Sequence, residues 1–352
     1  MLEERKTYEL NKLYLWNKNL PKGNIDGKEI IGLKPIDKKS YWQYDFNNSL
    51  DFLDVFDVNK SELYESEFEN YKIEYLYRGH ENYKWALIPS HFRKISQNLM
   101  TSYAYANGVQ QGEFKNFIRF IKGMDELGLY TNENSFNLTK LLNQSDEALG
   151  LNDTSQAIYF PKEKNLYELA LAQHYGVPTR LLDFTKNPLV SIFFATEKLY
   201  PFSKYEEDKR IGVWVIPKLL IEVAKHERYI KFIDVKKHQN KYIAAQKGIF
   251  LNYIPPCVEQ KENGTPFTTK KSQTCLKSLD QILTEKFETS IINQIIEEQI
   301  GRPMLFTLPH KELHQVSMRL EQLNINWTTM MPSLDGVKKE VERYSKKPYS
   351  NI

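Results

Sequence analysis

The sequence predicts an α+β fold in which a mixed sheet forms the core and helices flank it. Segments rich in aromatic and β-branched residues alternate with segments whose apolar residues recur at helical spacing. This interleaving is typical of mixed folds. Hydrophobic residues make up 41% of the 352 positions, which is enough for a sizeable core. The net charge of +3 is too small to favour a nucleic acid or a membrane surface as the partner.

Residues 1–45 are polar and rich in lysine, and we expect an amino-terminal arm in front of a single domain at 46–345. Two stretches inside the domain, 125–160 and 257–300, are predicted to be insertions. The first is rich in Asn and Ser without a clear period. The second begins as a polar loop and continues as a helical pattern with a break near Thr289.

Composition and periodicity predict the remaining elements. Strands are expected where β-branched and aromatic residues dominate, at 30–36, 72–80, 211–217, 230–233, 246–255 and 304–309. Helices are expected where apolar residues recur every three or four positions, at 46–56, 111–123, 310–323 and from 332 onward.

The stretch 172–188 contains the strongest local signals. A helix over 164–175 is predicted to end at Gly176, which can adopt the left-handed backbone that closes a helix. Asn187 and Pro188 are typical of the N-cap and first position of a second helix. The residues between the two helices are therefore expected to form a short turn or strand in a buried place.

Six polar residues around this turn form one candidate site: Gln173, His174, Tyr175, Thr179, Arg180 and Asp183. His174 lies near a helix C-terminus, where the dipole favours the protonated ring, so it could donate a proton or anchor a ligand. Arg180 and Asp183 cannot be buried without partners. The structural alternative is an Arg180–Asp183 bridge, with His174 and Tyr175 holding the turn.

A second candidate site is the end of the strand at 72–80, which reads Tyr77-Arg78-Gly79-His80. An arginine at a strand end can bind a phosphate or carboxylate through two parallel hydrogen bonds. Gly79 would let a ligand approach the backbone. The structural alternative is an arginine that pairs with a neighbouring acid such as Glu81, or that packs over an aromatic ring.

A third, weaker candidate is Gln246 with Gly248, at the start of a strand. No metal is expected, because His310 and His314 have helical spacing but lack a third ligand, and Cys257 and Cys275 match no zinc spacing. The two cysteines fit a reducing compartment. Since no apolar signal region or membrane-length segment is evident, we expect a cytoplasmic protein.

In this order the three groups resemble the motifs of the FRG domain, over roughly residues 48–340. The first motif, an aromatic residue followed by Arg-Gly, resembles Tyr77-Arg78-Gly79. The longest motif, Gln-His-x-Gly-x-Pro-Thr-Arg-Leu-Leu-Asp-aromatic-Thr, resembles residues 173–185. The other resemblances are Pro89-Ser90-His91-Phe92-Arg93, the set Gln246, Gly248 and Phe250, and the closing Ser333-Leu334-Asp335-Gly336.

FRG proteins are common in bacteria and phages, and their motif order is similar to that of arginine-type ADP-ribosyltransferases. The resemblance implies an ADP-ribosyltransferase-like fold and a toxin or phage-defence effector that transfers ADP-ribose from NAD or cleaves NAD. It implies that Arg78 binds the NAD phosphate or ribose, and that Thr179 or Tyr175 lines the nicotinamide pocket. Gln246 fits the first place of a Gln-x-Glu turn, but Gly248 stands where the glutamate belongs. Asp183 is then the alternative acid.

The expected catalytic residues are therefore Arg78, Gln246 and Asp183, and the expected substrate-binding residues are Tyr77, Gly79, His80, Gln173, His174, Tyr175, Thr179, Arg180 and Gly248. Two other functions stay open. One is a non-catalytic module that binds a nucleotide or another anion through Arg78 and Arg180. The other is association with a nucleic acid, which the near-neutral charge disfavours.

Overall fold

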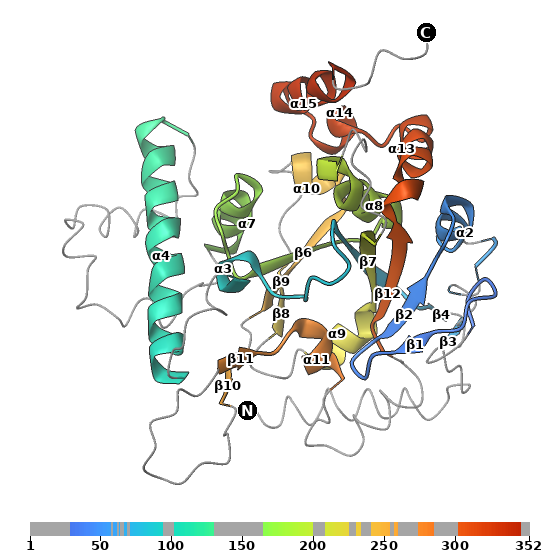
Figure 1. Cartoon of the computed structure of the whole chain (residues 1–352). Coiled ribbons are helices and arrows are strands. Elements are labelled where there is room, and N and C mark those ends of the chain that lie inside the picture. Colours follow the sequence, from blue (N-terminus) through green and yellow to red (C-terminus); the bar gives the residue numbers. More distant parts are fainter. Residues whose placement is uncertain are drawn as a thin grey trace.

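A mixed eight-stranded sheet forms the centre of the protein (Figure 1), in the order β1-β2-β12-β7-β5-β6-β9-β8. Neighbouring strands are antiparallel except for the pair β12–β2, which is parallel. The predicted α+β class with a mixed sheet core is confirmed. The computed structural model describes residues 29–57, 59–61, 63, 67–68, 71–93, 102–129, 165–199, 208–224, 230–233, 241–253, 257–259, 274–284 and 302–345.

The strands of the main sheet are β1 (Ile36–Asp37), β2 (Trp42–Asp45), β5 (Tyr75–His80), β6 (Leu181–Thr185), β7 (Arg210–Pro217), β8 (Ile230–Ile233), β9 (Gly248–Tyr253) and β12 (Met304–Pro309). Two short ribbons lie outside it, formed by β3 (Glu67–Phe68) with β4 (Tyr71–Lys72), and by β10 (Cys257–Glu259) with β11 (Thr274–Leu276). The predicted strands between 72 and 80 and from 211 onward are confirmed.

The helices are α2 (Ser49–Asp54), α3 (Ser90–Arg93), α4 (Ser102–Glu126), α7 (Leu166–His174), α8 (Pro188–Thr196), α9 (Lys218–Ala224), α10 (Lys241–Ala245), α11 (Leu279–Leu283), α13 (Leu313–Gln322), α14 (Trp327–Met330) and α15 (Leu334–Ser345). Two 3-10 helices, η4 (Glu197–Leu199) and η7 (His310–Glu312), adjoin α8 and α13.

Helices cover both faces of the sheet. On one face α2, α8 and α13 pack against β5, β7 and β12 and bury a large apolar cluster. On the opposite face α9 and α11 close a second cluster. β5 divides its side chains between them, because Tyr75 and Tyr77 lie in the first cluster and Leu76 lies in the second.

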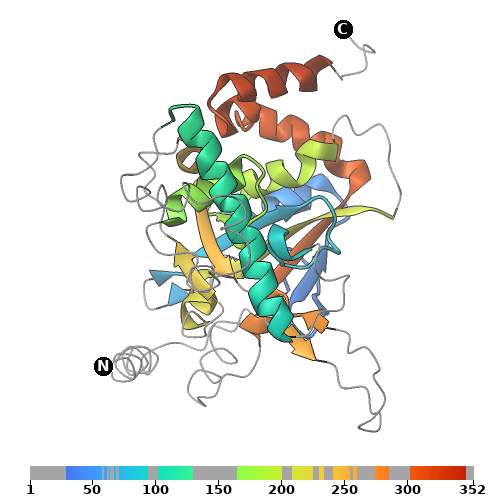
Figure 2. The same cartoon turned by 90° about the vertical axis from the view of Figure 1, so that its left-hand side faces the viewer.

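A third cluster joins α4 and α7 to strands β6, β8 and β9. Figure 2 shows α4 crossing this side of the molecule, while α14 and α15 lie together at the opposite end from the β10–β11 ribbon. The carboxyl-terminal helices therefore lie beside α8 and α10, where Trp327 of α14 packs against Phe193 and Phe194 of α8.

The helix ends of the central stretch follow the predicted chemistry. Gly176 has φ +86°, in the left-handed region, directly after α7 and its C-cap. Asn187 caps α8, its side-chain oxygen accepting from the Leu189 backbone N–H at 3.1 Å, and Pro188 is the first residue of that helix. The segment between the two helices enters the sheet as β6.

Two expectations about the chain's organisation differ from the structure. β2 pairs with β12 from Trp42↔Met304 onward, so the sheet begins before the expected domain start at residue 46. Four residues were too short a segment to show a strand pattern. The polar loop expected at the start of the 257–300 stretch is wrong at 257–259 and 274–276, where β10 and β11 pair. Residues 1–28, 130–164, 260–273 and 285–301, which include most of the expected arm and insertions, lie outside the described residues.

Candidate functional site

A cleft opens where strands β5 and β6 separate. β5 pairs with β7 from Tyr75 to His80, but with β6 it has the single register pair Tyr77↔Thr185. Beyond that point the Arg78 side chain connects the two strands, because its Nη1 donates to the backbone carbonyl of Asp183 at 2.6 Å. The guanidinium thus bonds to the backbone of the neighbouring strand at the point where the β5–β6 pairing has ended.

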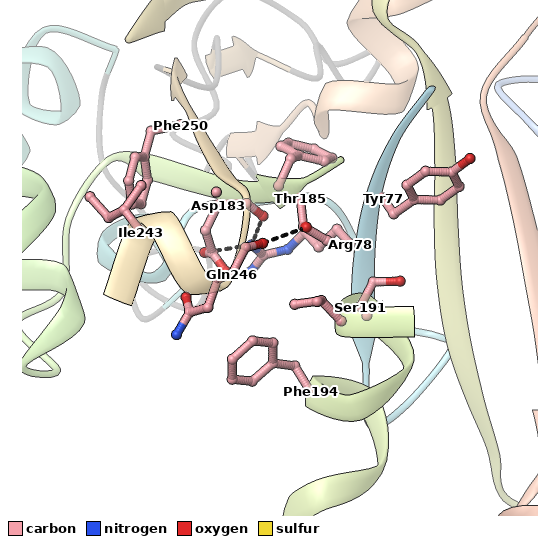
Figure 3. A pocket seen from close by; sticks show the side chains of 13 residues that line it. Tyr77, Arg78, Asp183, Thr185, Ser191, Phe194, Ile243, Gln246 and Phe250 are labelled. Atoms are coloured by element: carbon pink, nitrogen blue, oxygen red, sulfur yellow. Dashed lines mark hydrogen bonds and ion pairs between the residues drawn. The ribbon is translucent and has the colours of Figure 1, made fainter. Parts of the chain in front are cut away.

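The cleft has an enclosed volume of about 50 Å³. That space holds a few water molecules or one end of a larger ligand. Its walls combine an ion pair with hydroxyl and aromatic groups, as Figure 3 shows. The lining residues are Tyr77, Arg78, Gly79, Asp183, Phe184, Thr185, Val190, Ser191, Phe194, Ile243, Gln246, Gly248 and Phe250.

The charged group that faces the solvent in this cleft is Asp183. Its Oδ1 lies 2.6 Å from Nη1 of Arg78, and the side chain of Asp183 is 59% exposed whereas that of Arg78 is 12% exposed. Desolvation by the surrounding protein raises the pKa of Asp183, but the guanidinium of Arg78 outweighs it, and the pKa lies below its ordinary value. Asp183 is therefore a carboxylate at neutral pH, and Arg78 lies behind it.

His80 holds Arg78 from the protein interior. The Arg78 Nε donates to Nε2 of His80 at 3.1 Å, and Nδ1 of His80 lies 3.2 Å from the Trp85 carbonyl. Burial and the nearby Arg78 and Arg93 lower the pKa of His80 to about 3. The ring is neutral, and the two contacts require Nδ1 to donate and Nε2 to accept. His80, expected to touch substrate, instead fixes the orientation of Arg78.

Gln173 and Thr179 brace Asp183 from the other side. The Gln173 amide donates to Oδ1 of Asp183 at 2.9 Å, while its own carbonyl accepts a hydrogen bond from the Thr179 hydroxyl. Thr179 is fully buried. Neither residue lines the cleft. Gln173 restricts the rotamer of Asp183, which accepts from Gln173 and Arg78, and Thr179 in turn fixes the Gln173 amide.

Arg180 belongs to a different site. The bridge considered between Arg180 and Asp183 is wrong, because Arg180 forms an ion pair with Glu113 of α4, and both side chains are 1% exposed. Glu113 also accepts from the Arg180 backbone N–H at 2.6 Å. The sequence indicates that Glu113 is buried, since it shares a helical face with Phe117 and Ile121, but it does not indicate which cation Glu113 meets. A carboxylate in an apolar stripe needs a buried cation.

Gln246 lies at the cleft, but its amide is engaged elsewhere. Its Nε2 donates to the Met330 carbonyl of α14 at 3.0 Å, and its backbone carbonyl accepts from the Thr185 hydroxyl at 2.6 Å. Gly248 lies beside Thr185 in the β6–β9 register. Gln246 therefore joins the floor of the cleft to the carboxyl-terminal helices.

Gly79 serves packing as well as access. A Cβ at this position would lie 1.9 Å from the Ser191 carbonyl oxygen, so only glycine lets α8 approach β5 this closely. This contact places Ser191 and Phe194 of α8 against the cleft. In the first motif, Gly79 thus allows α8 to lie against β5, and Arg78 holds Asp183 in place.

His174 and Tyr175 lie outside the cleft lining. The His174 ring stacks on Tyr242 of α10, with centroids 4.2 Å apart and planes 19° apart. Burial and the charge of Lys339 lower the pKa of His174. The expectation of a protonated ring is therefore wrong, because burial and a nearby cation outweigh the helix dipole.

Seven lining residues were not among the expected site residues: Phe184, Thr185, Val190, Ser191, Phe194, Ile243 and Phe250. Thr185, Phe194 and Phe250 lie in or shortly after the motif segments. They would have been predicted if every residue of those segments had been expected to line the cleft. Ser191 and Ile243 have no distinguishing sequence signal. The contact of α8 and α10 with the sheet brings them to the cleft.

The fold and the cleft define an α+β protein with a charged cleft at a split between two central strands. The family model described as the FRG domain matches residues 73–204. The chain therefore contains an FRG domain, and the matched segment carries Arg78, Gly79 and Asp183. The cleft extends beyond the match, to Gln246 and Phe250.

The comparisons with curated proteins and with solved structures found no match to this chain. None of the helices in the described part of the chain has the length and apolar character needed to cross a membrane. Within the same residues no cluster of His, Cys, Asp and Glu side chains is suited to hold a metal ion.

Proposed function

We propose that the cleft cleaves NAD, and that the Asp183 carboxylate is the group that acts on the sugar. The observation that carries this proposal is the Arg78–Asp183 pair, in which Asp183 is ionised and faces outward. Asp183 is the sole carboxylate among the described residues that line the cleft. A fixed negative charge in a partly desolvated site stabilises positive charge that develops in a transition state.

The chemistry needs such a charge. The bond between ribose C1′ and the nicotinamide nitrogen breaks, its electron pair leaves with neutral nicotinamide, and the ribose becomes oxocarbenium-like. A water molecule or a nucleophilic side chain of a target then bonds to C1′ and releases its proton. Asp183 lowers the energy of the intermediate charge, while Arg78, His80 and Gln173 keep the carboxylate oriented.

The size and polarity of the cleft suit one end of NAD. Phe194 and Phe250 provide apolar walls for a flat ring, and Thr185 also lines the cleft. An enclosed space of about 50 Å³ admits only part of a dinucleotide. The remainder of the ligand would lie outside the enclosed part.

The test is nicotinamide release by the purified full-length chain incubated with NAD, followed by chromatography, with and without cell lysate. We expect release by the wild type and loss of release in Arg78→Ala, because Asp183 then loses its counterion and orientation. Circular dichroism establishes that the variant is folded. Absence of both nicotinamide and labelled macromolecule with the wild type would refute the proposal.

A second candidate function is binding of a nucleotide or another anion without turnover. Two guanidiniums favour it, because Arg78 and Arg93 both lower the pKa of Asp183, so two cations surround one carboxylate. This candidate predicts that ADP or phosphate raises the melting temperature while NAD stays intact. A melting temperature insensitive to both would exclude it.

A further inference from the structure

An aromatic and cationic cluster lies beside the cleft, and we call it the rim cluster. It consists of His174, Lys241, Tyr242, Trp327 and Lys339, contributed by α7, α10, α14 and α15. The Nζ of Lys339 lies 4.1 Å from the centroid of the Trp327 ring, and the Nζ of Lys241 lies 5.6 Å from that of Tyr242. His174 stacks on Tyr242.

The rim cluster is continuous with the walls of the cleft. Trp327 lies edge-on to Phe194, which lines the cleft, with ring centroids 6.2 Å apart. Tyr242 precedes the lining residue Ile243 on α10. Gln246, at the cleft floor, donates to the carbonyl of Met330, the last residue of α14. A ligand that enters the cleft and extends past Phe194 therefore meets Trp327 and Lys339.

The charges at the rim differ from those inside the protein. Arg78 and Arg180 form ion pairs with carboxylates, whereas Lys241 and Lys339 form none with any residue that the structure describes. Glu340, next to Lys339, is occupied by the Trp327 backbone N–H at 2.8 Å and by Arg343. One acid, Asp335, lies close enough to Tyr175 to raise its pKa. The two ammonium groups are thus available to an anion.

An unsatisfied polar atom marks the same place. The Nε2 of His174 is buried and has no hydrogen-bond partner among the described residues. A buried ring nitrogen without a partner costs free energy, which a ligand's oxygen could recover. Ammonium groups set beside aromatic faces suit a molecule that carries both phosphate and a flat base.

We propose that the rim cluster binds the diphosphate of a nucleotide through Lys339 and Lys241, while the sugar at one end of that ligand lies against Asp183. The placement of the sugar against Asp183 rests on the proposed function, whereas the binding of the diphosphate by the two lysines does not. The substrate class is therefore a nucleoside diphosphate derivative. A free nucleoside or a riboside without phosphate would reach the cleft but not the rim lysines.

The test is isothermal titration of the full-length chain with ADP and with pyrophosphate. Lys339→Gln is expected to weaken binding roughly tenfold, the effect of losing one charge-assisted hydrogen bond. Lys338→Gln is the matched control, because Lys338 is the preceding residue, is 72% exposed and pairs with Glu342. We expect this control to bind like the wild type.

Three results overturn the proposal. They are failure of the wild type to bind either ADP or pyrophosphate, equal weakening by both variants, and no weakening by Lys339→Gln. Nicotinamide release separates this inference from the proposed function. If ADP binding depends on Lys339 but NAD is not cleaved, the rim site stands and the cleavage falls. If NAD is cleaved equally by the wild type and Lys339→Gln, the proposed cleavage is supported and the rim site is refuted.

Discussion

At the scale of single residues, the protein has two arginine–carboxylate pairs with different roles. One is buried and structural, and the other lines the cleft. The Arg180–Glu113 pair is almost fully buried, with both side chains 1% exposed, and it joins α4 to the start of β6. In the Arg78–Asp183 pair the acid is open to solvent and lines the cleft. The motif at 173–185 therefore supplies Asp183, Phe184 and Thr185 to the cleft lining, while Gln173, Thr179 and Arg180 support the site from outside it.

Arg180→Met is predicted to destabilise the fold by about 3–5 kcal/mol, because it leaves the Glu113 carboxylate buried without a partner. Urea denaturation measures the change. The double variant Arg180→Met with Glu113→Leu should recover most of the loss, since no buried charge remains. Arg119→Met, at an exposed position of the same helix, serves as the control and should change stability by less than about 0.5 kcal/mol. An Arg180→Met protein as stable as the wild type would contradict the assigned role of the pair.

At the scale of elements, the approach of α8 to β5 sets the shape of the cleft. Gly79 permits it, and the same helix brings Ser191 and Phe194 to the wall. The sequence predicted both elements, because the strand has a period of two and Asn187-Pro188 marks a helix start. It did not predict their contact, since a glycine at a strand end allows the close approach of either a ligand or a neighbouring backbone segment.

Gly79→Ala is expected to cost about 1–3 kcal/mol, because the added methyl group would overlap the Ser191 carbonyl and displace α8. The control is Gly123→Ala in α4, where an added Cβ meets nothing within 4 Å. That variant should be more stable than the wild type by about 0.5–1 kcal/mol, as alanine favours a helix. Thermal or urea unfolding of both proteins makes the comparison. Equal stability of Gly79→Ala and the wild type would show that α8 adjusts freely.

At the scale of the whole molecule, two buried titratable groups make the stability of the fold depend on pH in opposite directions. Folded Glu197, buried against Arg343, has its pKa raised by desolvation from 4.5 to about 7. The folded protein then binds a proton that the unfolded chain releases, so this group's contribution to stability falls as pH rises from 4.5 to 7. The lowered pKa of His80, about 3 against 6.5, makes its contribution fall as pH drops below 6.5.

Glu197→Gln removes the first effect and leaves the second. The free energy of unfolding of the variant, relative to the wild type, should therefore increase by about 3 kcal/mol between pH 4.5 and pH 7. Other groups titrate in both proteins, so the difference isolates Glu197. Urea denaturation at a series of pH values provides it. A difference that does not change with pH would mean that Glu197 has the same pKa in the folded and the unfolded states.

The whole-molecule arrangement also shows where sequence reasoning reached its limit. The motif segments at 77–79, 183–185 and 246–250 meet at one cleft, whereas Arg180, expected among the binding residues, lies outside its lining. The partner of Arg180 did not follow, because Glu113 is 67 residues away and only the packing of α4 brings it near. The link from Gln246 to Met330 spans 84 residues and depends on how α14 folds back. Such long-range contacts leave little local signal.

The central claim is that Asp183, held in place by Arg78, stabilises positive charge on a sugar. The most direct test is Asp183→Asn, in which the side chain keeps its shape and hydrogen-bonding capacity but loses its charge. We predict that nicotinamide release at saturating NAD falls by about 10²–10³-fold, while calorimetry gives an NAD affinity close to that of the wild type. Undiminished release by Asp183→Asn would contradict the account.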